Sequence, residues 1–428
     1  MANEVNDLAE IYGVSLRINY EKFLKNKLAR VRNIMRKHNL EAIICLSDSN
    51  ISYVTNVPPF PSLGGGASGN HYAILPLEGL PVYFDECDAA YHMEKLINYI
   101  EVEYSIPATG GVFNVQPMQA REHLVKMFAT QIKDKLKQLK LDKSAIAIDL
   151  NVPHIIKALK EEGIEINLDG GEVLREARMI KTAEELKLFS TLGNVIDGCF
   201  GIAAESIRPG VTEREVLGKI IDYAINQGVM VNGGYIISGP HTWPKDLTRQ
   251  FTDRRFRPDD TVVIDLHNFM LAGYTSCCYR TFSVGKASSD VREAYQTARE
   301  WLKEAEEILR PGITTKDVVE KWPDEIELWS QRPPFIKSER DKLSTFFNNM
   351  GHGLGLQSLY DPPFFWRPLS IRWPQRLEAG MVIALETQEG TKDNRCGVRI
   401  EDMIIITDTG YKVITKWPAD EITELPLY

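Results

Sequence analysis

Val262-Val263-Ile264-Asp265-Leu266-His267 is the first of five short segments that each carry a possible metal ligand on or beside a strand. The other four are Gly273-Tyr274-Thr275-Ser276-Cys277-Cys278-Tyr279-Arg280-Thr281-Phe282, Met350-Gly351-His352-Gly353-Leu354-Gly355-Leu356, Val382-Ile383-Ala384-Leu385-Glu386 and Val398-Arg399-Ile400-Glu401-Asp402. β-Branched and apolar runs of this length favour strands, in which side chains alternate between two faces. The segments therefore predict a site built on neighbouring strands.

The first three segments supply nitrogen, sulfur and oxygen donors. Asp265 and His267 are two residues apart, so both side chains leave the same face of an extended strand. Cys277 lies where the chain returns beside that strand, with Cys278 on the alternate face. His352 sits among glycines, which allow backbone and ligand to approach closely.

The last two segments add carboxylates. Glu386 and Glu401 each follow an apolar run, and a carboxylate in such surroundings needs a metal ion, a proton or a cationic partner. Taken singly, each of these residues also fits an ordinary role as a buried histidine, a small buried cysteine or an acid at the rim. Their recurrence at strand ends in one half of the chain favours a shared metal site.

The segments resemble the pita-bread (M24) metallopeptidase superfamily. The likeness rests on Gly-Tyr before the second ligand position, Arg-Thr-Phe after it, His-Gly-Leu-Gly-Leu at the third and Glu-Ala-Gly-Met-Val before the fourth. That superfamily includes methionine aminopeptidase, aminopeptidase P, prolidase, creatinase and the dimethylsulfoniopropionate lyase of marine bacteria, and the motif pattern is closest to the lyase. The resemblance implies an α/β (α+β) fold, with a creatinase-like α/β domain over residues 1–170 and a pita-bread catalytic domain over 171–428.

The resemblance also implies the ligand set. Asp265, His352, Glu386 and Glu401 match metal ligands of the family, whereas Cys277 stands where the peptidases have a second aspartate. His267 takes the place of an additional acidic ligand of the lyase. A thiolate is softer than a carboxylate and favours zinc or iron over manganese or cobalt. We therefore expect one or two divalent ions per chain, of altered identity.

Two loops depart from the peptidase pattern of one histidine upstream of the first aspartate and another beyond the metal-binding histidine. The upstream loop Ser238-Gly239-Pro240-His241-Thr242-Trp243-Pro244 resembles the lyase's Ser-Gly-Pro-x-Thr-x-Pro. The downstream loop Leu356-Gln357-Ser358-Leu359-Tyr360-Asp361-Pro362 contains no histidine. His241 either faces the pocket or lies on the surface.

Several further residues are candidates for contact with a substrate. Tyr274 and Tyr360 could orient the substrate or transfer a proton, or serve as structural tyrosines. Arg399 could neutralise a ligand carboxylate or hold an acidic group of the substrate. Trp243 and Trp366 could pack over a sulfonium or quaternary cation, or form part of the pocket wall or core. Of the two glutamates at the site, Glu386 is assigned both metal binding and proton transfer.

Composition bounds the class of protein. The net charge of -9 over 428 residues is spread without long runs of one sign, which argues against a nucleic-acid surface or a polybasic membrane patch. Residues 1–7 are polar and acidic, and no long apolar span or signal peptide is visible. Six cysteines at irregular spacing, without a C-x-x-C pair, fit a reducing cytoplasm.

Helix-like and strand-like segments alternate up to a boundary near Asp169-Gly170-Gly171, which indicates an α/β layer. Beyond it, Thr182-Ala183-Glu184-Glu185 forms a capping box that predicts the start of a helix. Arg208-Pro209-Gly210-Val211-Thr212-Glu213-Arg214-Glu215-Val216 recurs as Arg310-Pro311-Gly312-Ile313-Thr314-Thr315-Lys316-Asp317-Val318. This repeat predicts two related halves, with the site between them.

We therefore expect a metal-dependent enzyme that acts on a small polar metabolite by lyase or C–N hydrolase chemistry, as the resemblance to the lyase implies. An Xaa-Pro aminopeptidase or dipeptidase is the alternative. A metal-free, creatinase-like enzyme or a protein that binds ligand without turnover is a second alternative. The resemblance suggests a homodimer, and nothing in the sequence points to nucleic acid or membrane as a partner.

Overall fold

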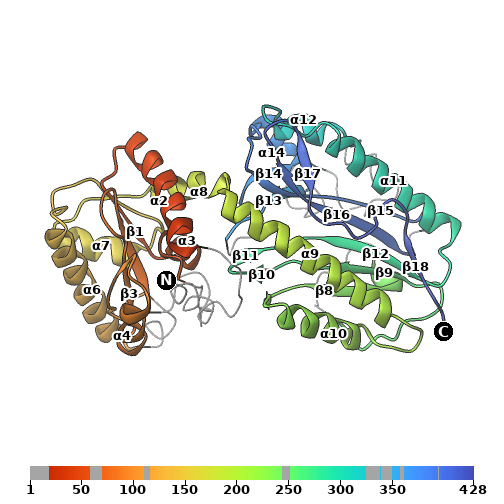
Figure 1. The fold of residues 1–428 in the computed structure, drawn as a ribbon, viewed down its shortest axis with the longest axis horizontal. Coiled ribbons are helices and arrows are strands. Elements are labelled where there is room, and N and C mark those ends of the chain that lie inside the picture. Colours follow the sequence, from red (N-terminus) through yellow and green to blue (C-terminus); the bar gives the residue numbers. More distant parts are fainter. Residues whose placement is uncertain are drawn as a thin grey trace. The chain divides into compact units, whose positions relative to one another are not determined.

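The computed structural model describes residues 19–57, 70–109, 116–242, 251–323, 338, 349–356, 361–393 and 395–428. The chain divides into two compact units, Met1–Arg178 and Met179–Tyr428, each with its own helices and sheets (Figure 1). The α/β fold class with two domains is thereby confirmed. Among the described helices, none combines the length and apolar character needed to cross a membrane.

The N-terminal unit holds a mixed six-stranded sheet in the order β4-β3-β2-β1-β5-β6. Strand β1 pairs antiparallel with β2 and parallel with β5. Residues buried at helical and strand spacing on β1, β2, β5, α6 and α7 form its core. The elements are α2 (Tyr20–Lys37), β1 (Ala42–Cys45), α3 (Asp48–Thr55), β2 (Tyr72–Pro76), β3 (Val82–Asp85), α4 (Cys87–Leu96), β4 (Glu101–Tyr104), α6 (Met118–Gln138), β5 (Ile146–Ile148), α7 (Pro153–Glu161), β6 (Ile166–Asn167) and α8 (Gly170–Met179).

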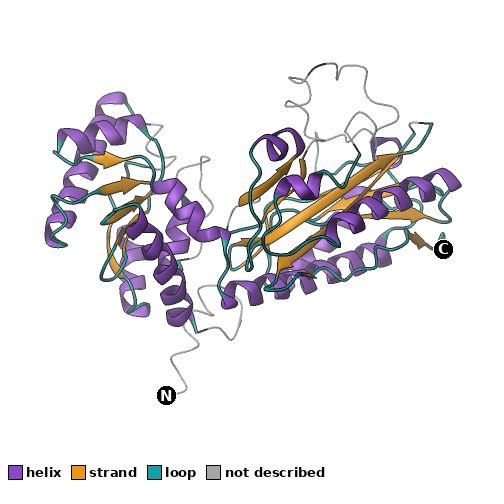
Figure 2. Cartoon of the chain, turned by 90° about the horizontal axis from the view of Figure 1, so that it is seen from above, coloured by secondary structure: helices purple, strands orange, loops and turns teal. Residues whose placement is uncertain are grey.

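The described residues of the C-terminal unit form three sheets, in the orders β11-β10-β7, β18-β12-β9-β8 and β14-β13-β15-β16-β17. Figure 2 shows helices running alongside its long strands. The helices are α9 (Ala183–Ser206), α10 (Glu213–Asn226), α11 (Ser289–Glu306), α12 (Thr315–Val319) and α14 (Arg367–Arg372), with a 3-10 turn η1 at Gly239–Thr242. The strands are β7 (Met230–Val231), β8 (Tyr235–Ser238), β9 (Thr261–Asp265), β10 (Phe269–Leu271), β11 (Tyr274–Thr275), β12 (Tyr279–Val284), β13 (Asn349–Gly353), β14 (Asp361–Trp366), β15 (Val382–Gly390), β16 (Gly397–Ile406), β17 (Tyr411–Val413) and β18 (Thr423–Leu425).

Helix α11 packs against one face of the long hairpin β15–β16 and seals it from water. Ile383, Leu385, Ile400 and Ile404 on that face join Leu302 of α11 in one apolar core. Burying each such side chain stabilises the fold by roughly 1.5–3 kcal/mol. The apolar residues occupy alternate positions, so the residues between them are directed to the opposite face of the hairpin. That opposite face carries the polar residues of the site.

The predicted repeat is present in the fold and is confirmed at both capping boxes. Thr212 begins α10 and Thr314 begins α12, each paired with the acid three residues later. The glycine that precedes each threonine by two residues has a left-handed φ, which favours glycine. The same main-chain hydrogen bonds follow in both copies, through Phe256 to Gly210 and Val211 in the first copy and through Leu377 to Gly312 and Ile313 in the second. The capping box predicted at Thr182 is also present and begins α9.

Candidate metal centre

Two carboxylates face each other across the hairpin β15–β16. Glu386 lies directly opposite Glu401 in the antiparallel ladder. Two residues before Glu386, Ala384 is paired with Met403 of β16 and with His352 of β13. Because side chains two residues apart share a face, His352 and the two glutamates project to the same side of the sheet. The strand register thus brings together three of the predicted ligands that lie far apart in sequence.

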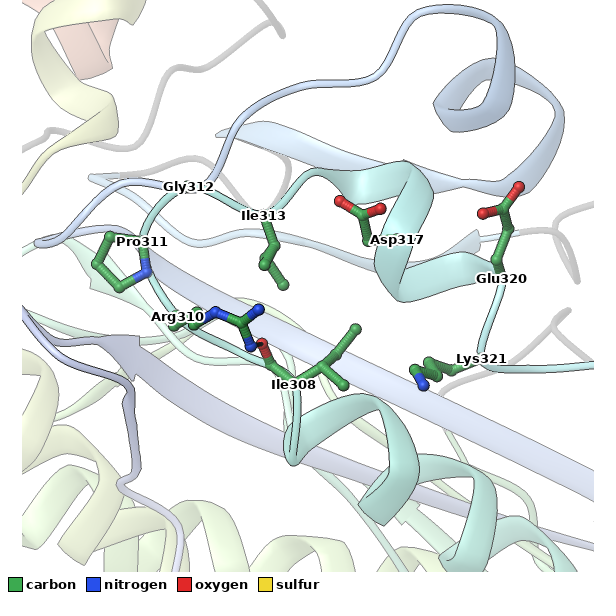
Figure 3. A pocket seen from close by; sticks show the side chains of 8 residues that line it. All are labelled: Ile308, Arg310, Pro311, Gly312, Ile313, Asp317, Glu320 and Lys321. Carbon is green, nitrogen blue, oxygen red and sulfur yellow. Dashed lines mark hydrogen bonds between the residues drawn. The ribbon is translucent and has the colours of Figure 1, made fainter.

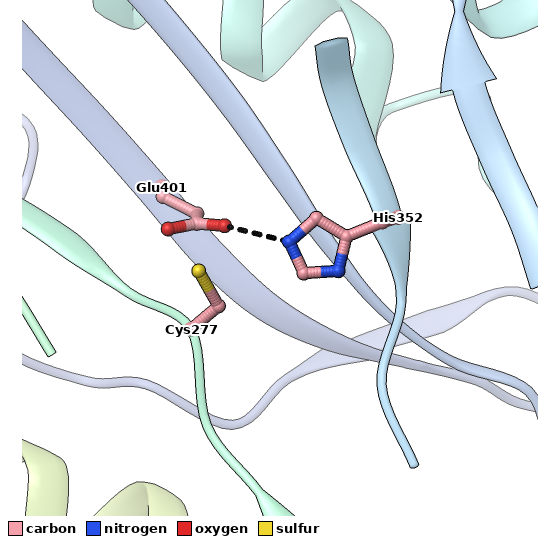
Figure 4. A group of neighbouring side chains, drawn as sticks. All are labelled: Cys277, His352 and Glu401. Carbon is pink, nitrogen blue, oxygen red and sulfur yellow. Dashed lines mark ion pairs between the residues drawn. The ribbon is translucent and has the colours of Figure 1, made fainter. Parts of the chain in front are cut away.

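Cys277, His352 and Glu401 form a buried cluster whose donor atoms all lie within 4.8 Å of one another. Figure 4 shows the three side chains converging from the segment before β12, from β13 and from β16. His352 Nε2 lies 3.8 Å from a carboxylate oxygen of Glu401. Main-chain bonds, including Thr275 N–H to the Gly355 carbonyl, tie the cysteine segment to the histidine segment.

The histidine presents the nitrogen that a metal requires. His352 Nδ1 lies 3.1 Å from the carbonyl of Gly353, so we assign the proton to Nδ1, which leaves the lone pair on Nε2 toward Glu401. The glycines around it permit close packing as predicted. A Cβ on Gly351 would lie 2.5 Å from the Ala384 carbonyl, and one on Gly353 would lie 2.4 Å from the Asp361 carbonyl.

Cys277 and Cys278 point to opposite sides, as predicted. Cys277 faces the cluster, whereas the Cys278 thiol donates to the main-chain carbonyl of Glu401 at 3.0 Å. Burial raises the pKa of the Cys277 thiol well above its usual value, and the negative charges of Glu401, Asp265 and Glu386 raise it further. A cation at the cluster acts in the opposite direction, because it stabilises the thiolate.

Asp265 ends β9 and is held by the histidine two residues on. Its carboxylate lies 2.7 Å from His267 Nδ1, while His267 Nε2 accepts the backbone N–H of Gly234 at 3.2 Å. The acceptor role of Nε2 assigns the proton to Nδ1, so the ring is neutral and donates to Asp265. Both ring nitrogens of His267 are therefore engaged with protein groups, and the ring orients Asp265. The ligand role of His267 stays a prediction.

The residues present fit a divalent metal ion. A thiol, an imidazole and a carboxylate are the three donor types that bind zinc and other divalent transition metals in proteins, and here all three are buried together. Asp265 and Glu386 lie outside the 4.8 Å cluster of described residues but close enough for their charges to raise the pKa of Cys277. Their role as oxygen ligands stays a prediction.

The remaining predicted residues lie at varied places. The Tyr274 hydroxyl donates to Glu185 of α9 at 2.9 Å, which is a structural contact. His241, in the turn η1, is exposed. Trp366 is half-buried at the end of β14, with its ring 5.9 Å from that of Phe364. Two predicted residues, Trp243 and Tyr360, lie outside the described ranges.

Arg399 is on the same strand face as Glu401 and is 2% exposed. Its guanidinium lies over the ring of Tyr279, with 5.6 Å between the guanidinium carbon and the ring centroid. Neither terminal nitrogen has a hydrogen-bond partner among the described residues. A buried cation of this kind is costly unless a ligand supplies a counter-charge.

Sequence reasoning missed Arg280, which supports the cluster from behind. This buried guanidinium donates to the main-chain carbonyl of Glu401 and to the Asp402 carboxylate, the latter at 2.6 Å. It also contacts the Cys278 thiol at 3.3 Å. Arg280 thus fixes the backbone beside two candidate ligands. Its only signal in the sequence was its place in the Arg-Thr-Phe motif.

A separate hollow of about 560 Å³ lies on the second repeat and shares no residue with the cluster (Figure 3). Its charges are of both signs, and the carboxylate of Asp317 already caps α12 through Thr314. We assign it no role in the site. Its lining consists of Ile308, Arg310, Pro311, Gly312, Ile313, Asp317, Glu320 and Lys321.

Solved structures share the fold over nearly the whole chain. An Xaa-Pro dipeptidase from Bacillus anthracis superposes with a TM-score of 0.70 at 21% identity, over 94% of this chain and 100% of that one. A prolidase from Thermococcus sibiricus gives 0.70 at 23% identity, over 93% and 98%.

Curated relatives carry related names. The Xaa-Pro dipeptidase of Pyrococcus horikoshii is 27% identical over 402 residues, which are 92% of this chain and 97% of the relative. A probable dipeptidase, PepE, of Mycobacterium tuberculosis is 29% identical over 252 residues. That match covers 59% of this chain and 62% of the relative's length.

These names correct the expected activity. The prediction of lyase-like chemistry on a small polar metabolite is wrong, because the relatives and structural neighbours are named dipeptidases and prolidases. The physical reason is that buried metal ligands resemble one another across the superfamily, so their pattern does not distinguish a lyase from a peptidase. The absence of the two loop histidines does not by itself exclude a peptidase.

Two family models match the chain in succession. Residues 27–180 match the Creatinase/Prolidase N-terminal domain. Residues 188–408, just over half of the chain, match Metallopeptidase family M24 and include every candidate ligand described above. The chain belongs to metallopeptidase family M24.

Proposed function

We propose that this protein is a metal-dependent dipeptidase that cleaves the bond before proline in Xaa-Pro dipeptides. The observation that supports it most directly is the buried cluster of Cys277, His352 and Glu401 on the sheet face that also carries Arg399. The cluster offers a metal site for the scissile bond, and Arg399 offers a positive charge for an acidic end group. The names of the relatives supply the choice of peptide.

Cys277, His352 and Glu401 would hold the metal, with Asp265 and Glu386 adding oxygen ligands. A bound divalent ion supplies Lewis acidity toward a peptide carbonyl and toward water. The burial of the cluster keeps bulk water away from it, which strengthens every electrostatic interaction there. His352 is held in the ligand tautomer by the Gly353 carbonyl.

Proton transfer falls to Glu386 in this proposal. Its carboxylate is 8% exposed and lies opposite Glu401, so one of its oxygens can bind metal while the other accepts a proton from the attacking water. The same carboxylate then returns the proton to the nitrogen of the leaving proline. Arg399 holds the carboxylate of that residue by charge-assisted hydrogen bonds.

Metal identity follows from the thiol. We propose that Cys277 binds as a thiolate and makes zinc or iron the preferred metal over manganese or cobalt. Elemental analysis of the purified protein tests this, with about one zinc or iron per chain expected. Substitution with cobalt(II) should give a thiolate charge-transfer band that Cys277→Ser abolishes. An unchanged spectrum would place the thiol outside the coordination shell.

The activity itself is tested on a panel of dipeptides. Protein reconstituted separately with zinc, iron, manganese and cobalt should release free proline from Ala-Pro and leave Pro-Ala intact, as followed by mass spectrometry. If no Xaa-Pro substrate is cleaved with any of the four metals, the peptidase proposal fails. A metal-free protein that resists reconstitution would instead support the creatinase-like or non-catalytic alternative.

A further inference from the structure

Gln388 and Arg399 face each other across the hairpin, one row beyond the paired glutamates. The ladder pairs Glu386 with Glu401 and, two residues on, Gln388 with Arg399. Residues two apart on a strand share a face, so all four side chains are directed to the same side of β15–β16. The amide and the guanidinium therefore form the next row of side chains on the face that carries the two glutamates.

Both side chains are buried with unused hydrogen-bonding capacity. Gln388 is 9% exposed and Arg399 is 2% exposed. The Oε1 atom of Gln388 and both terminal nitrogens of Arg399 have no hydrogen-bond partner among the described residues. Native proteins rarely leave buried polar groups unsatisfied, because each costs roughly 1–3 kcal/mol and a charged group costs more. Two such groups on facing strands indicate a ligand that supplies their missing hydrogen-bond partners.

The surrounding structure holds Arg399 in place without neutralising it. Its backbone N–H donates to the Thr281 hydroxyl at 2.9 Å, and that hydroxyl donates to the Arg399 carbonyl at 2.8 Å. The ring of Tyr279 lies beneath the guanidinium. An arginine stacked on an aromatic ring keeps its planar N–H edge available for an anion.

We infer that Gln388 is a specificity-determining residue that acts with Arg399 to bind the terminal carboxylate of the substrate. Arg399 donates two N–H groups to the carboxylate, and the Gln388 amide nitrogen donates a third. A remaining N–H of Arg399 is donated to Gln388 Oε1, which satisfies the amide oxygen as well. The pair then selects a free carboxylate over a terminal amide or a longer chain.

The spacing of the two layers favours a short substrate. Two residues along an antiparallel strand span about 6.8 Å, which separates the glutamate row from the glutamine–arginine row. A single extended residue spans at most about 3.6 Å, so the carboxylate of the residue after the scissile bond falls between the rows, within reach of both side chains. Two further residues would carry the carboxylate past the pair.

The inference rests on the proposed function for its choice of substrate, and kinetics on matched peptides test it. Ala-Pro and its C-terminal amide would be compared for wild-type enzyme, Gln388→Leu and a control, Thr387→Val. Thr387 is the adjacent residue and bonds to the Ala298 carbonyl on the opposite face. Thermal unfolding would verify that each variant folds.

For Gln388→Leu we expect the KM of Ala-Pro to rise about tenfold, while kcat stays within about twofold and the KM of the amide is unchanged. Gln388→Glu should raise the KM of Ala-Pro further, because it sets a carboxylate against the substrate's own. Thr387→Val should leave the ratio of acid to amide unchanged. Equal losses on the acid and the amide in Gln388→Leu would overturn the inference.

A binding measurement separates this inference from the proposed activity. Calorimetric titration of the zinc-loaded protein with proline and with prolinamide needs no turnover. If no dipeptide is cleaved but proline binds at least tenfold more tightly than prolinamide, and Gln388→Leu removes that difference, the carboxylate site stands and the dipeptidase function falls. If wild-type protein shows no preference for proline, the inference falls whether or not peptides are cleaved.

Discussion

Two buried arginines, Arg280 beside strand β16 and Arg399 within it, differ in their hydrogen-bond partners. Arg280 is 1% exposed and is satisfied by the Asp402 carboxylate, the Glu401 carbonyl and the Trp417 carbonyl. Arg399 is 2% exposed, and its terminal nitrogens have no partner among the described residues. Arg280 completes an internal network, whereas the terminal nitrogens of Arg399 have no counter-charge among the described residues. The difference teaches that burial alone does not distinguish a structural charge from a binding one, whereas the state of its partners does.

The network around Arg280 continues to α11 on the side of the hairpin away from the pocket. Arg299 lies 3.3 Å from Glu306 and 4.0 Å from Asp402. Burial, together with the charge of Asp402, raises the pKa of Glu306 to about 8. Acidic and basic side chains are therefore partners of one another on this face.

The largest effect is expected from Arg280→Met, which leaves the buried Asp402 carboxylate without its main partner. Removing one member of a buried ion pair costs about 3–5 kcal/mol of folding stability. Urea denaturation followed by circular dichroism measures it. Arg399→Met is the matched control and should cost less than about 1 kcal/mol, because Arg399 forms no ion pair with the described residues. Comparable losses of stability in the two variants would show that both arginines are structural.

The second effect concerns binding and belongs to Arg399. Arg399→Met should raise the KM for an Xaa-Pro dipeptide about 10–100-fold, since a hydrogen bond to a charged group contributes roughly 1.5–3 kcal/mol. Steady-state kinetics with zinc-loaded enzyme measure it. An unchanged KM together with a large loss of stability would show that Arg399 is a structural residue like Arg280.

The third effect tests the orientation of Asp265 by His267. His267→Phe removes the N–H donor and should weaken metal binding about 10–100-fold, the usual effect of losing a partner of a metal ligand. His267→Asn retains a donor close to the position of Nδ1 and should recover most of the affinity. Titration with cobalt(II) followed by absorbance reports both. If His267 were itself a ligand, the asparagine variant would also alter the cobalt spectrum.

The smallest effect is a pH dependence of the internal network. The pKa of Glu306 is about 8 in the folded protein and near 4.5 when unfolded, so its contribution to stability is complete below pH 4.5 and is lost as the pH rises toward 8. Glu306→Gln cannot ionise and keeps a donor toward Asp402. We therefore expect wild type to lose roughly 1 kcal/mol more than this variant between pH 7 and pH 8. Parallel curves of stability against pH would contradict it.

Much of the fold was readable from local chemistry. The β-branched run before Asp265 predicted β9, and the spacing of Thr182 and Glu185 predicted the start of α9, because a capping box satisfies backbone groups within four residues. The cluster of Cys277, His352 and Glu401 was also predicted, but through a resemblance of motifs. No local pattern specifies that β13 pairs with β15 or that β12 lies beside β16.

The rest depended on contacts that sequence does not display. In the fold the two ring nitrogens of His267 meet Asp265 and the backbone of Gly234, and no sequence pattern predicts these contacts. The sequence does not single out Gln388, since a lone glutamine after a predicted strand is an ordinary surface residue in most chains. Its burial opposite Arg399 became visible only with the strand register. Activity was misjudged because ligand residues do not encode the substrate.

The alternation of side chains along β16 makes the hairpin intolerant of changes in length. Glu401 belongs to the cluster with Cys277 and His352, whereas its neighbour Asp402 accepts a hydrogen bond from Arg280. Deleting one residue between Gly397 and Arg399 would move every later side chain to the other face. Asp402 would then enter the pocket and Glu401 would meet α11, so both charge systems would fail together. Viable homologous sequences should therefore vary here by replacement, with insertions and deletions confined to the turn before Gly397.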